Sequence, residues 1–253
     1  MNDQIDAEFS SQAKQMAAAP AFRAEAVLQR LVKALGNSAS DCILDLACGP
    51  GIVAEAVAPH VREVMGIDAT PEMIRLAQER LEQAHLANAR FEVAAAEDLP
   101  FRQGRFDQVI TRLSFHHFAD VPTVLAEIRR VLRPAGRLIA ADVVSSEDAD
   151  EAALHNSLEK LRDPTHVRMF SASELVDLLG SAGFRVVHHE SWRQGRAFPE
   201  WAAIIADPAR TVPLENVMRA LARAGQGAGI ALREESGELR FAHTWLLSVA
   251  VAG

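Results

Sequence analysis

The sequence lacks the features that mark secreted, disulfide-bonded and membrane-spanning proteins. It has only two cysteines, Cys42 and Cys48, so a disulfide framework is implausible, and two thiols make a poor zinc site. No apolar run reaches the ~18 residues that cross a bilayer. The N-terminus has no basic flank followed by an apolar run, so we expect no signal peptide. The default expectation is a cytoplasmic protein without a membrane span or a metal.

The chain also lacks an excess of basic residues. Asp and Glu number 34 against 26 Lys and Arg, which gives a net charge of −8, and no basic stripe is visible. We therefore expect no nucleic-acid partner. Apolar residues make up 49% of the 253 residues, enough for one α/β domain with an insertion or cap.

Seven short apolar segments alternate with segments of helical periodicity. This pattern predicts an α/β fold: a doubly wound, Rossmann-like, mostly parallel sheet of seven strands. In such a sheet the ligand lies at the carboxyl ends of the strands, which places the loops after residues 46, 67, 93, 111 and 144 around one site. The expected strands are 42–46, 61–67, 89–93, 106–111, 137–144, 184–190 and 241–252.

Residues that commonly cap helices mark where several of the expected helices begin. Thr70 before Pro71, and Asp120, stand at expected helix starts, and Ser171 with Glu174 forms a capping box. Residues 1–35 and 53–58 are also expected to be helical. Residues 147–170 and 198–230 have a different, more charged or glycine-interrupted character, and we expect them to be helical cap elements.

The loop Asp45-Leu46-Ala47-Cys48-Gly49-Pro50-Gly51 ends the first strand. Its glycines let the backbone approach a ligand, although a glycine loop can also be a plain turn. No Lys-Ser/Thr pair follows, so it is not a phosphate loop. Ala47 stands where a dinucleotide fingerprint has its first glycine. The Asp45 carboxylate would repel a pyrophosphate but could hold an ammonium group.

Two further acidic positions follow the next strands. Asp68 ends the second strand, where a carboxylate accepts from ribose hydroxyls, with helix capping as the alternative. Residues 95–101 follow the third strand. Glu97 there could read an adenine edge with backbone N–H groups, or belong to a charged surface turn.

Taken together, these segments resemble the class I S-adenosylmethionine-dependent methyltransferases, and most closely the type 11 small-molecule group with the ubiquinone and menaquinone biosynthesis enzymes. The resemblance covers about residues 40–190. It rests on ILDLACGPG, VMGIDATPEMIRLAQ, AAAEDLPF, FDQVITRLSFHHF and VLRPAGRLIAADVV in that order. It implies S-adenosyl-L-methionine as cofactor, S-adenosyl-L-homocysteine as product, and a small-molecule acceptor. The chain would be one domain over 1–253, with a cofactor-binding core at 40–145, and a monomer or homodimer.

The resemblance also implies a cofactor site, residue by residue. The loop after the first strand would surround the methionine part, Asp68 would hold the ribose, and the later loops would flank adenine and the sulfonium. The implied residues are Asp45, Ala47, Cys48, Gly49, Gly51, Asp68, Ala69, Met73, Ala96, Glu97, Asp98, Thr111, Arg112 and Leu113.

The acceptor side is a set of candidates. Methyl transfer from a sulfonium is an in-line displacement that depends mainly on orientation and needs a base only if the acceptor loses a proton. His116 and His117 are the candidate bases, with a structural role as the alternative. His155, Arg162, His166 and Arg168 are candidates for binding the acceptor, or for a solvated ion-pair network.

Other readings stay open from the sequence. Asp142 is a further candidate base, and Trp192, Phe198 and Trp201 are expected to pack the cap against the sheet rather than line an acceptor pocket. A protein of the same fold that binds the cofactor without transferring methyl is the main alternative. A nicotinamide oxidoreductase is disfavoured by Asp45 and by the absence of a third fingerprint glycine.

Overall fold

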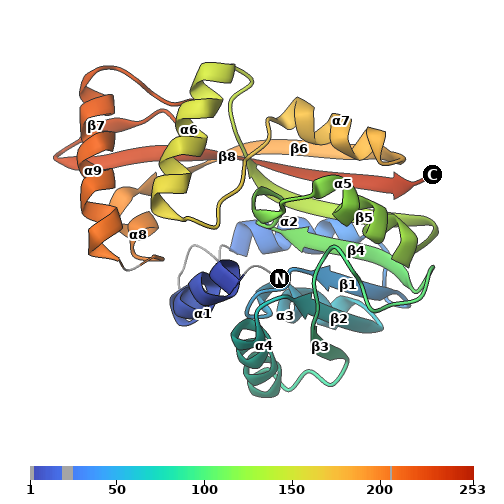
Figure 1. Ribbon diagram of the computed structural model, residues 1–253. Coiled ribbons are helices and arrows are strands. Elements are labelled where there is room, and N and C mark those ends of the chain that lie inside the picture. Colours follow the sequence, from blue (N-terminus) through green and yellow to red (C-terminus); the bar gives the residue numbers. More distant parts are fainter. Residues whose placement is uncertain (1–2, 19–24, 206) are drawn as a thin grey trace.

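The computed structural model describes residues 3–18, 25–205 and 207–253, and its centre is one twisted sheet (Figure 1). The strand order is β3-β2-β1-β4-β5-β8-β6, with β8 antiparallel to both of its neighbours and the other pairs parallel. The doubly wound fold is therefore confirmed. An eighth short strand, β7, pairs with β8. The strands are β1 Cys42–Leu46, β2 Glu63–Asp68, β3 Ala89–Val93, β4 Phe106–Arg112, β5 Leu132–Val144, β6 Phe184–Ala197, β7 Arg233–Glu235 and β8 Glu238–Ala252.

Helices cover both faces of the sheet because its central strands are buried on both sides; all five residues of β1 are buried. On one face, α2 (Glu25–Leu35), α3 (Ile52–Val57) and α4 (Pro71–Gln83) pack on β1 and β2. On the other, α5 (Val121–Val131) and α7 (Ala172–Ser181) pack on β4 and β5. Short 3-10 turns lie at Ala58–His60 and Phe115–His117.

The N-terminal segment, expected to be helical over 1–35, is helical in its described part. It contains α1 (Asp3–Ala18) and α2, and residues 19–24 lie outside the described part. Arg80 of α4 donates to the Ala17 carbonyl at 3.3 Å, and Glu8 forms an ion pair with Arg210. These contacts tie α1 to both the core and the cap.

The cap is built on an extension of β6 and β8 beyond the core sheet. It comprises α6 (Ala149–Arg162), α8 (Phe198–Ala202), α9 (Pro208–Arg223) and β7, around an apolar core that includes Phe198, Trp201 and Phe241. Figure 1 shows these elements at one end of the sheet. Trp192 instead stacks on Trp245 at 5.7 Å between ring centroids.

Several expected boundaries in the cap were wrong. Residues 147–170 are not one helix, since α6 ends at Arg162 where Pro164 disfavours a helical conformation at Asp163 (φ −127°, ψ 105°). The segment 198–230, expected to be helical with glycine breakers at 225, 227 and 229, contains α8 and α9 in its described part, and α9 ends at Arg223. The strand expected over 184–190 continues to Ala197 because it pairs with β8 along its whole length.

The last and fifth strands also begin earlier than expected. β8 begins at Glu238 rather than at 241. Ser236 (φ 53°) and Gly237 (φ 83°) form the two-residue turn of a β7–β8 hairpin. β5 begins at Leu132, which pairs with Phe106 ahead of a register irregularity.

Two of the three expected helix caps are confirmed. The Asp120 side chain accepts from the Thr123 N–H at 3.1 Å, and Ser171 and Glu174 form a full capping box. Thr70 occupies the N-cap position of α4, but its side chain makes no capping hydrogen bond. The Thr70 N–H donates to Asp68 Oδ1 at 2.9 Å, a bond that becomes important below.

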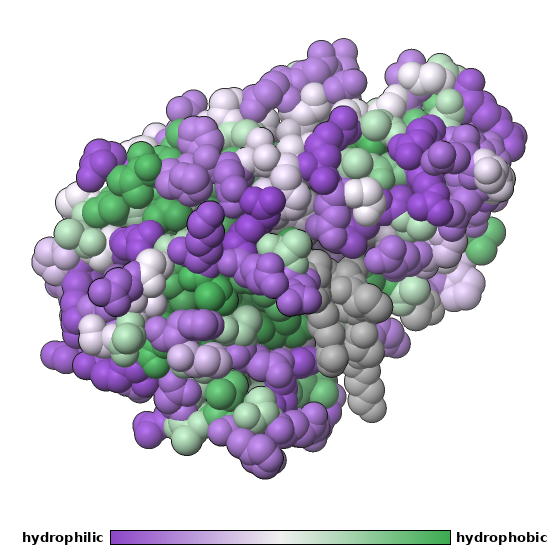
Figure 2. All heavy atoms as spheres, turned by 180° about the vertical axis from the view of Figure 1, so that it is seen from behind, coloured by the Kyte–Doolittle hydropathy of each residue, from purple (hydrophilic) through white to green (hydrophobic). Residues whose placement is uncertain are grey.

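The outer surface is mixed in polarity. Figure 2 shows a face that is mostly covered by hydrophilic residues, with a group of hydrophobic residues near its middle. Among the helices described, none combines the length and the apolar character needed to cross a membrane.

Candidate active site

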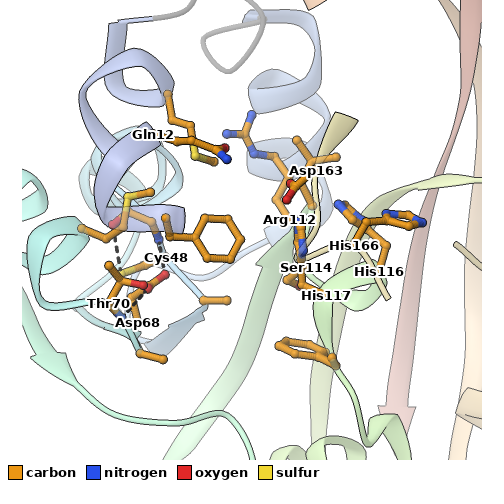
Figure 3. A pocket seen from close by; sticks show the side chains of 18 of the residues that line it. Gln12, Cys48, Asp68, Thr70, Arg112, Ser114, His116, His117, Asp163 and His166 are labelled. Carbon is orange, nitrogen blue, oxygen red and sulfur yellow. Dashed lines mark hydrogen bonds between the residues drawn. The ribbon is translucent and has the colours of Figure 1, made fainter. Parts of the chain in front are cut away.

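A cavity of about 620 Å³ lies at the carboxyl ends of the parallel strands. Its walls come from the loops after β1, β2, β3 and β4, from α1, and from the cap. Figure 3 shows two facing groups of side chains with Gln12 of α1 beside them: Cys48, Asp68 and Thr70 on one side, and Arg112, Ser114, His116, His117, Asp163 and His166 on the other. The doubly wound topology thus brings the predicted loops to one site.

The loop after β1 is held in an unusual backbone conformation. Ala47 (φ 54°) and Gly49 (φ 51°) both adopt left-handed torsions, and the Cys48 N–H donates to the Ile67 carbonyl at 2.9 Å. A Cβ on Gly49 would meet no atom within 4 Å. Gly49 therefore allows the backbone turn, and its missing side chain leaves open space beside the cavity.

Asp45 is a buried carboxylate with an unsatisfied oxygen. The side chain is 1% exposed, and its Oδ2 has no hydrogen-bond partner among the described residues. Burial raises the pKa of Asp45 to about 7, against the opposing effect of the nearby Arg112 guanidinium. A buried, unpaired oxygen is costly unless a ligand satisfies it, and Asp45 lines the cavity.

Asp68 organises two loops at once. Its Oδ2 accepts from the Gly49 N–H at 2.9 Å and its Oδ1 from the Thr70 N–H at 2.9 Å. Burial raises the pKa of this carboxyl, although both bonds favour the charged form. An ionised carboxylate has about four lone-pair sites, so roughly two remain for a ligand.

The loop after β3 contributes one apolar and one acidic side chain. Ala96 is buried, Glu97 is exposed, and both line the cavity, as do Ala69 and Met73 from the loop and helix after β2. Asp98 is exposed and does not line it.

Asp142 of β5 holds the turn after β4. Its Oδ2 accepts from the N–H groups of Ser114 (3.0 Å) and Phe115 (2.8 Å), and its Oδ1 lies 2.7 Å from His116 Nδ1. Burial disfavours the His116 imidazolium, but the Asp142 carboxylate outweighs it, so the pKa of His116 is raised. The contact with Asp142 orients the His116 ring through Nδ1. Nε2 is the other ring nitrogen of this side chain, which lines the cavity.

The other two histidines at this wall are held neutral. Burial, together with His116, lowers the pKa of His117 to about 3, and burial lowers that of His166 to about 4. His117 Nδ1 lies 3.2 Å from the Thr165 carbonyl, and His166 Nε2 lies 2.8 Å from Asn156 Oδ1. The Val167 and Arg168 N–H groups donate to the His116 carbonyl, so the segment after α6 is docked directly on the turn after β4.

Most of the predicted site residues meet at this cavity. Five do not line it. Gly51 packs against α4, and the Thr111 hydroxyl is buried and donates to the Leu46 carbonyl. Asp98 faces solvent, Arg168 pairs with Glu174 on the surface, and His155 lies in the cap. The residues that do are Asp45, Ala47, Cys48, Gly49, Asp68, Ala69, Met73, Ala96, Glu97, Arg112, Leu113, His116, His117, Arg162 and His166.

Sequence reasoning missed several lining residues that come from distant parts of the chain. Phe9, Gln12 and Met16 come from α1, and Arg196, His243 and Trp245 come from the β6–β8 extension. Trp201, expected to pack, is 5% exposed in the cap core and also lines the cavity. No local motif marks these positions, because the fold alone brings them to the site.

Gly51 has a packing role that gives a stability prediction. It has φ 76°, and a Cβ there would lie 3.0 Å from Ala77 Cβ and 3.1 Å from Phe91 Cζ. Left-handed torsions cost a non-glycine residue roughly 1–2 kcal/mol and overpacking adds roughly 1–3. We expect Gly51→Ala to lower the free energy of unfolding by about 3 kcal/mol, as measured by urea denaturation.

Gly104→Ala is the matched control. Gly104 has a similar φ of 66°, but a Cβ there would meet nothing within 4 Å. We expect a loss of only about 1 kcal/mol, the cost of the torsion alone. Equal losses in the two variants would contradict the packing role of Gly51.

Comparison with known proteins places this fold and site in one family. A family model described as a methyltransferase domain matches residues 44–140. The uncharacterized methyltransferase YcgJ of Bacillus subtilis is 33% identical over 171 residues, 68% of either chain. Its crystal structure superposes with a TM-score of 0.82 at 27% identity, over 89% of this chain and 97% of that one.

Two further structures share the fold. A putative methyltransferase from Bacillus halodurans gives a TM-score of 0.83 at 25% identity, covering 88% of this chain and 97% of that one. The cyclase SpnF gives 0.62 at 20% identity, covering 88% and 80%, and at that identity shows the fold alone. From the sequence match, the structural match and the strand-end cavity, the chain belongs to the class I S-adenosylmethionine-dependent methyltransferases.

Proposed function

We propose that the loops after β1, β2 and β3 bind S-adenosylmethionine and that its methyl group passes to a small-molecule acceptor held between the turn after β4 and the cap. The observation that carries this proposal is the unpartnered Oδ2 of Asp45. A buried carboxylate oxygen at a cavity wall that has no hydrogen-bond partner among the described residues fits the ammonium group of an amino acid.

The rest of the wall fits the remaining parts of the cofactor. Asp68 has lone pairs for the ribose hydroxyls, Ala69 and Met73 offer apolar contact to adenine, and Ala96 and Glu97 stand at its edge. The left-handed loop from Ala47 to Gly49 leaves space for the methionine part. When bound, the cofactor supplies a methyl group already activated on a sulfonium.

The residues of the chain then contribute positioning and proton transfer. His116, oriented by Asp142, accepts a proton at Nε2 from an acceptor that must lose one. His117 is too weak a base for this task because its pKa is about 3. Burial lowers the pKa of Arg112 to about 10, and the negative charges of Asp45 and Asp142 oppose this shift.

The acceptor side favours a molecule with an apolar body and an oxygen group. Trp201 and Trp245 supply aromatic surface, while Arg162 and Arg196 supply cations. Arg162 stacks on Trp201 at 4.8 Å and is bonded to Glu159 at 3.0 Å. Both Arg162 and Arg196 are largely buried, so an anionic or hydroxyl oxygen would be bound in a poorly hydrated site.

Calorimetry of the folded protein with S-adenosylmethionine and S-adenosylhomocysteine tests the proposal. We expect micromolar binding of both and none of NAD. Below about pH 7 the Asp45 carboxyl becomes protonated and loses its charge, so affinity should fall by up to about tenfold per pH unit. Arg112 and Asp68 are the other charged groups that act on Asp45.

Asp45→Asn keeps the shape of the side chain and removes the titrating charge. We expect it to weaken binding at pH 8 and to flatten the pH dependence below 7. A folded protein that takes up neither ligand, or an unchanged pH dependence in the variant, would contradict the assignment of Asp45.

A second candidate function is cofactor binding without methyl transfer. It is supported by the shared fold of the cyclase SpnF. The two are separated by incubating the protein with labelled cofactor and a panel of phenols, quinols, amines and carboxylic acids. Label in an acceptor supports methyl transfer, and tight binding without any labelled product supports the second candidate.

A further inference from the structure

Three buried side chains meet where the cap joins the cavity. His155 and Glu159 lie one turn apart on α6, and His243 comes from β8. Their exposed fractions are 2%, 4% and 5%. Glu159 Oε1 lies 3.7 Å from His155 Nε2 and 3.2 Å from His243 Nε2, and the three atoms are within 4.8 Å of one another.

Both histidine nitrogens lack a hydrogen-bond partner. His155 Nε2 and His243 Nε2 are buried without one among residues 3–18, 25–205 and 207–253. The two Nε2 atoms lie near the Glu159 carboxylate without a hydrogen bond of good geometry, which is costly for buried polar atoms. A group that accepts lone pairs from all three atoms would remove this cost.

Arg162 fixes the carboxylate for that task. Its Nε donates to Glu159 Oε2 at 3.0 Å, which leaves Oε1 toward the two rings. Residues that orient a ligating side chain in this way are typical of metal sites. The spacing of His155 and Glu159 also matches the four-residue spacing by which two ligands on one helix face hold a metal.

We propose that His155, Glu159 and His243 bind a divalent first-row transition ion, Zn²⁺ foremost. Two imidazoles and one carboxylate are the donor set of zinc sites that keep a position open. Glu159 and His243 line the cavity, so the open position faces it and would take the acceptor's oxygen group. That last step rests on the proposed function. This site could not be predicted from the sequence because its third ligand, His243, lies far along the chain from His155 and Glu159.

Cobalt and zinc titrations of the full, chelator-treated protein test the site. We expect one equivalent of Co²⁺ to bind and give visible absorption without a thiolate charge-transfer band, which excludes Cys42 and Cys48. Zn²⁺ should displace it. His243→Ala and Glu159→Gln should each weaken Co²⁺ binding at least tenfold.

His189→Ala is the matched control, since His189 is exposed on β6 and should leave binding unchanged. Thermal melts identify any variant that fails to fold, and His243→Gln then replaces it as a variant of similar volume. Failure of the folded wild-type protein to bind either ion stoichiometrically, or equal affinity in the folded ligand variants, overturns the proposal. Calorimetry of the metal-free protein with S-adenosylhomocysteine reports separately on the proposed function.

Discussion

Replacing Asp68 by alanine is expected to weaken the binding of S-adenosylhomocysteine by more than 100-fold. The carboxylate is proposed to accept two hydrogen bonds from the ribose, and bonds to a charged group contribute about 1.5–3 kcal/mol each. The same change leaves the Gly49 and Thr70 N–H groups without their acceptor, so the loops on both sides of the ligand lose their anchor. Isothermal titration calorimetry measures the loss.

Two variants separate these effects. Asp68→Asn keeps one oxygen for a backbone N–H but removes the charge, and we expect an intermediate loss. Asp98→Ala removes an acidic side chain that does not itself line the cavity, and it should change affinity less than threefold. If Asp68→Ala retains near wild-type affinity in a folded protein, the ribose assignment is wrong.

The second large effect is expected at His116. For an acceptor that must lose a proton, His116→Ala should lower kcat by about 10²–10⁴-fold, the usual contribution of a general base. The Kd of S-adenosylhomocysteine should stay unchanged. His117→Gln should change kcat less than about tenfold because the ring is already neutral and weakly basic. A large loss of kcat in His117→Gln and a small one in His116→Ala would instead identify His117 as the base.

The pH profile gives an independent check on the role of Asp142. A base acts in its neutral form, so the rate rises as pH passes upward through the His116 pKa, which lies above its ordinary value. Asp142→Asn removes the carboxylate that raises that pKa. The acidic limb of the profile should therefore move to lower pH while kcat falls. If the acidic limb of the pH profile does not move in Asp142→Asn, the limb reports the titration of another group.

The cofactor wall was accessible from the sequence because each of its parts is local. Asp45, Asp68 and Glu97 stand within a few residues of the strand ends that position them, and parallel strands bring their carboxyl ends together. Gly51 and Thr111 stand in the same motifs but serve the scaffold. A motif identifies the loop, and only the three-dimensional packing shows which of its members face inward.

The acceptor wall could not be read in the same way. The His116 and Asp142 pair joins two strands, and Gln12, Trp245 and His243 reach the cavity from the two ends of the chain. Arg168 was predicted to bind the acceptor, but it does not line the cavity. It stands among charged residues near the site, but a local partner, Glu174, holds it at the surface. When a side chain has several possible partners, neither composition nor the periodicity of apolar residues predicts which partner it will contact.

The long β6–β8 ribbon has a consequence for how such proteins diversify. One half of the ribbon belongs to the core sheet, and the other half carries α8, α9 and β7, while α6 is inserted after β5. These segments contribute the cap side of the cavity, whereas the loops at Asp45 and Asp68 come from β1 and β2. Selection can therefore change the acceptor side of the cavity while the loops proposed to bind the methyl donor are kept, and a laboratory graft of the cap segments can do the same.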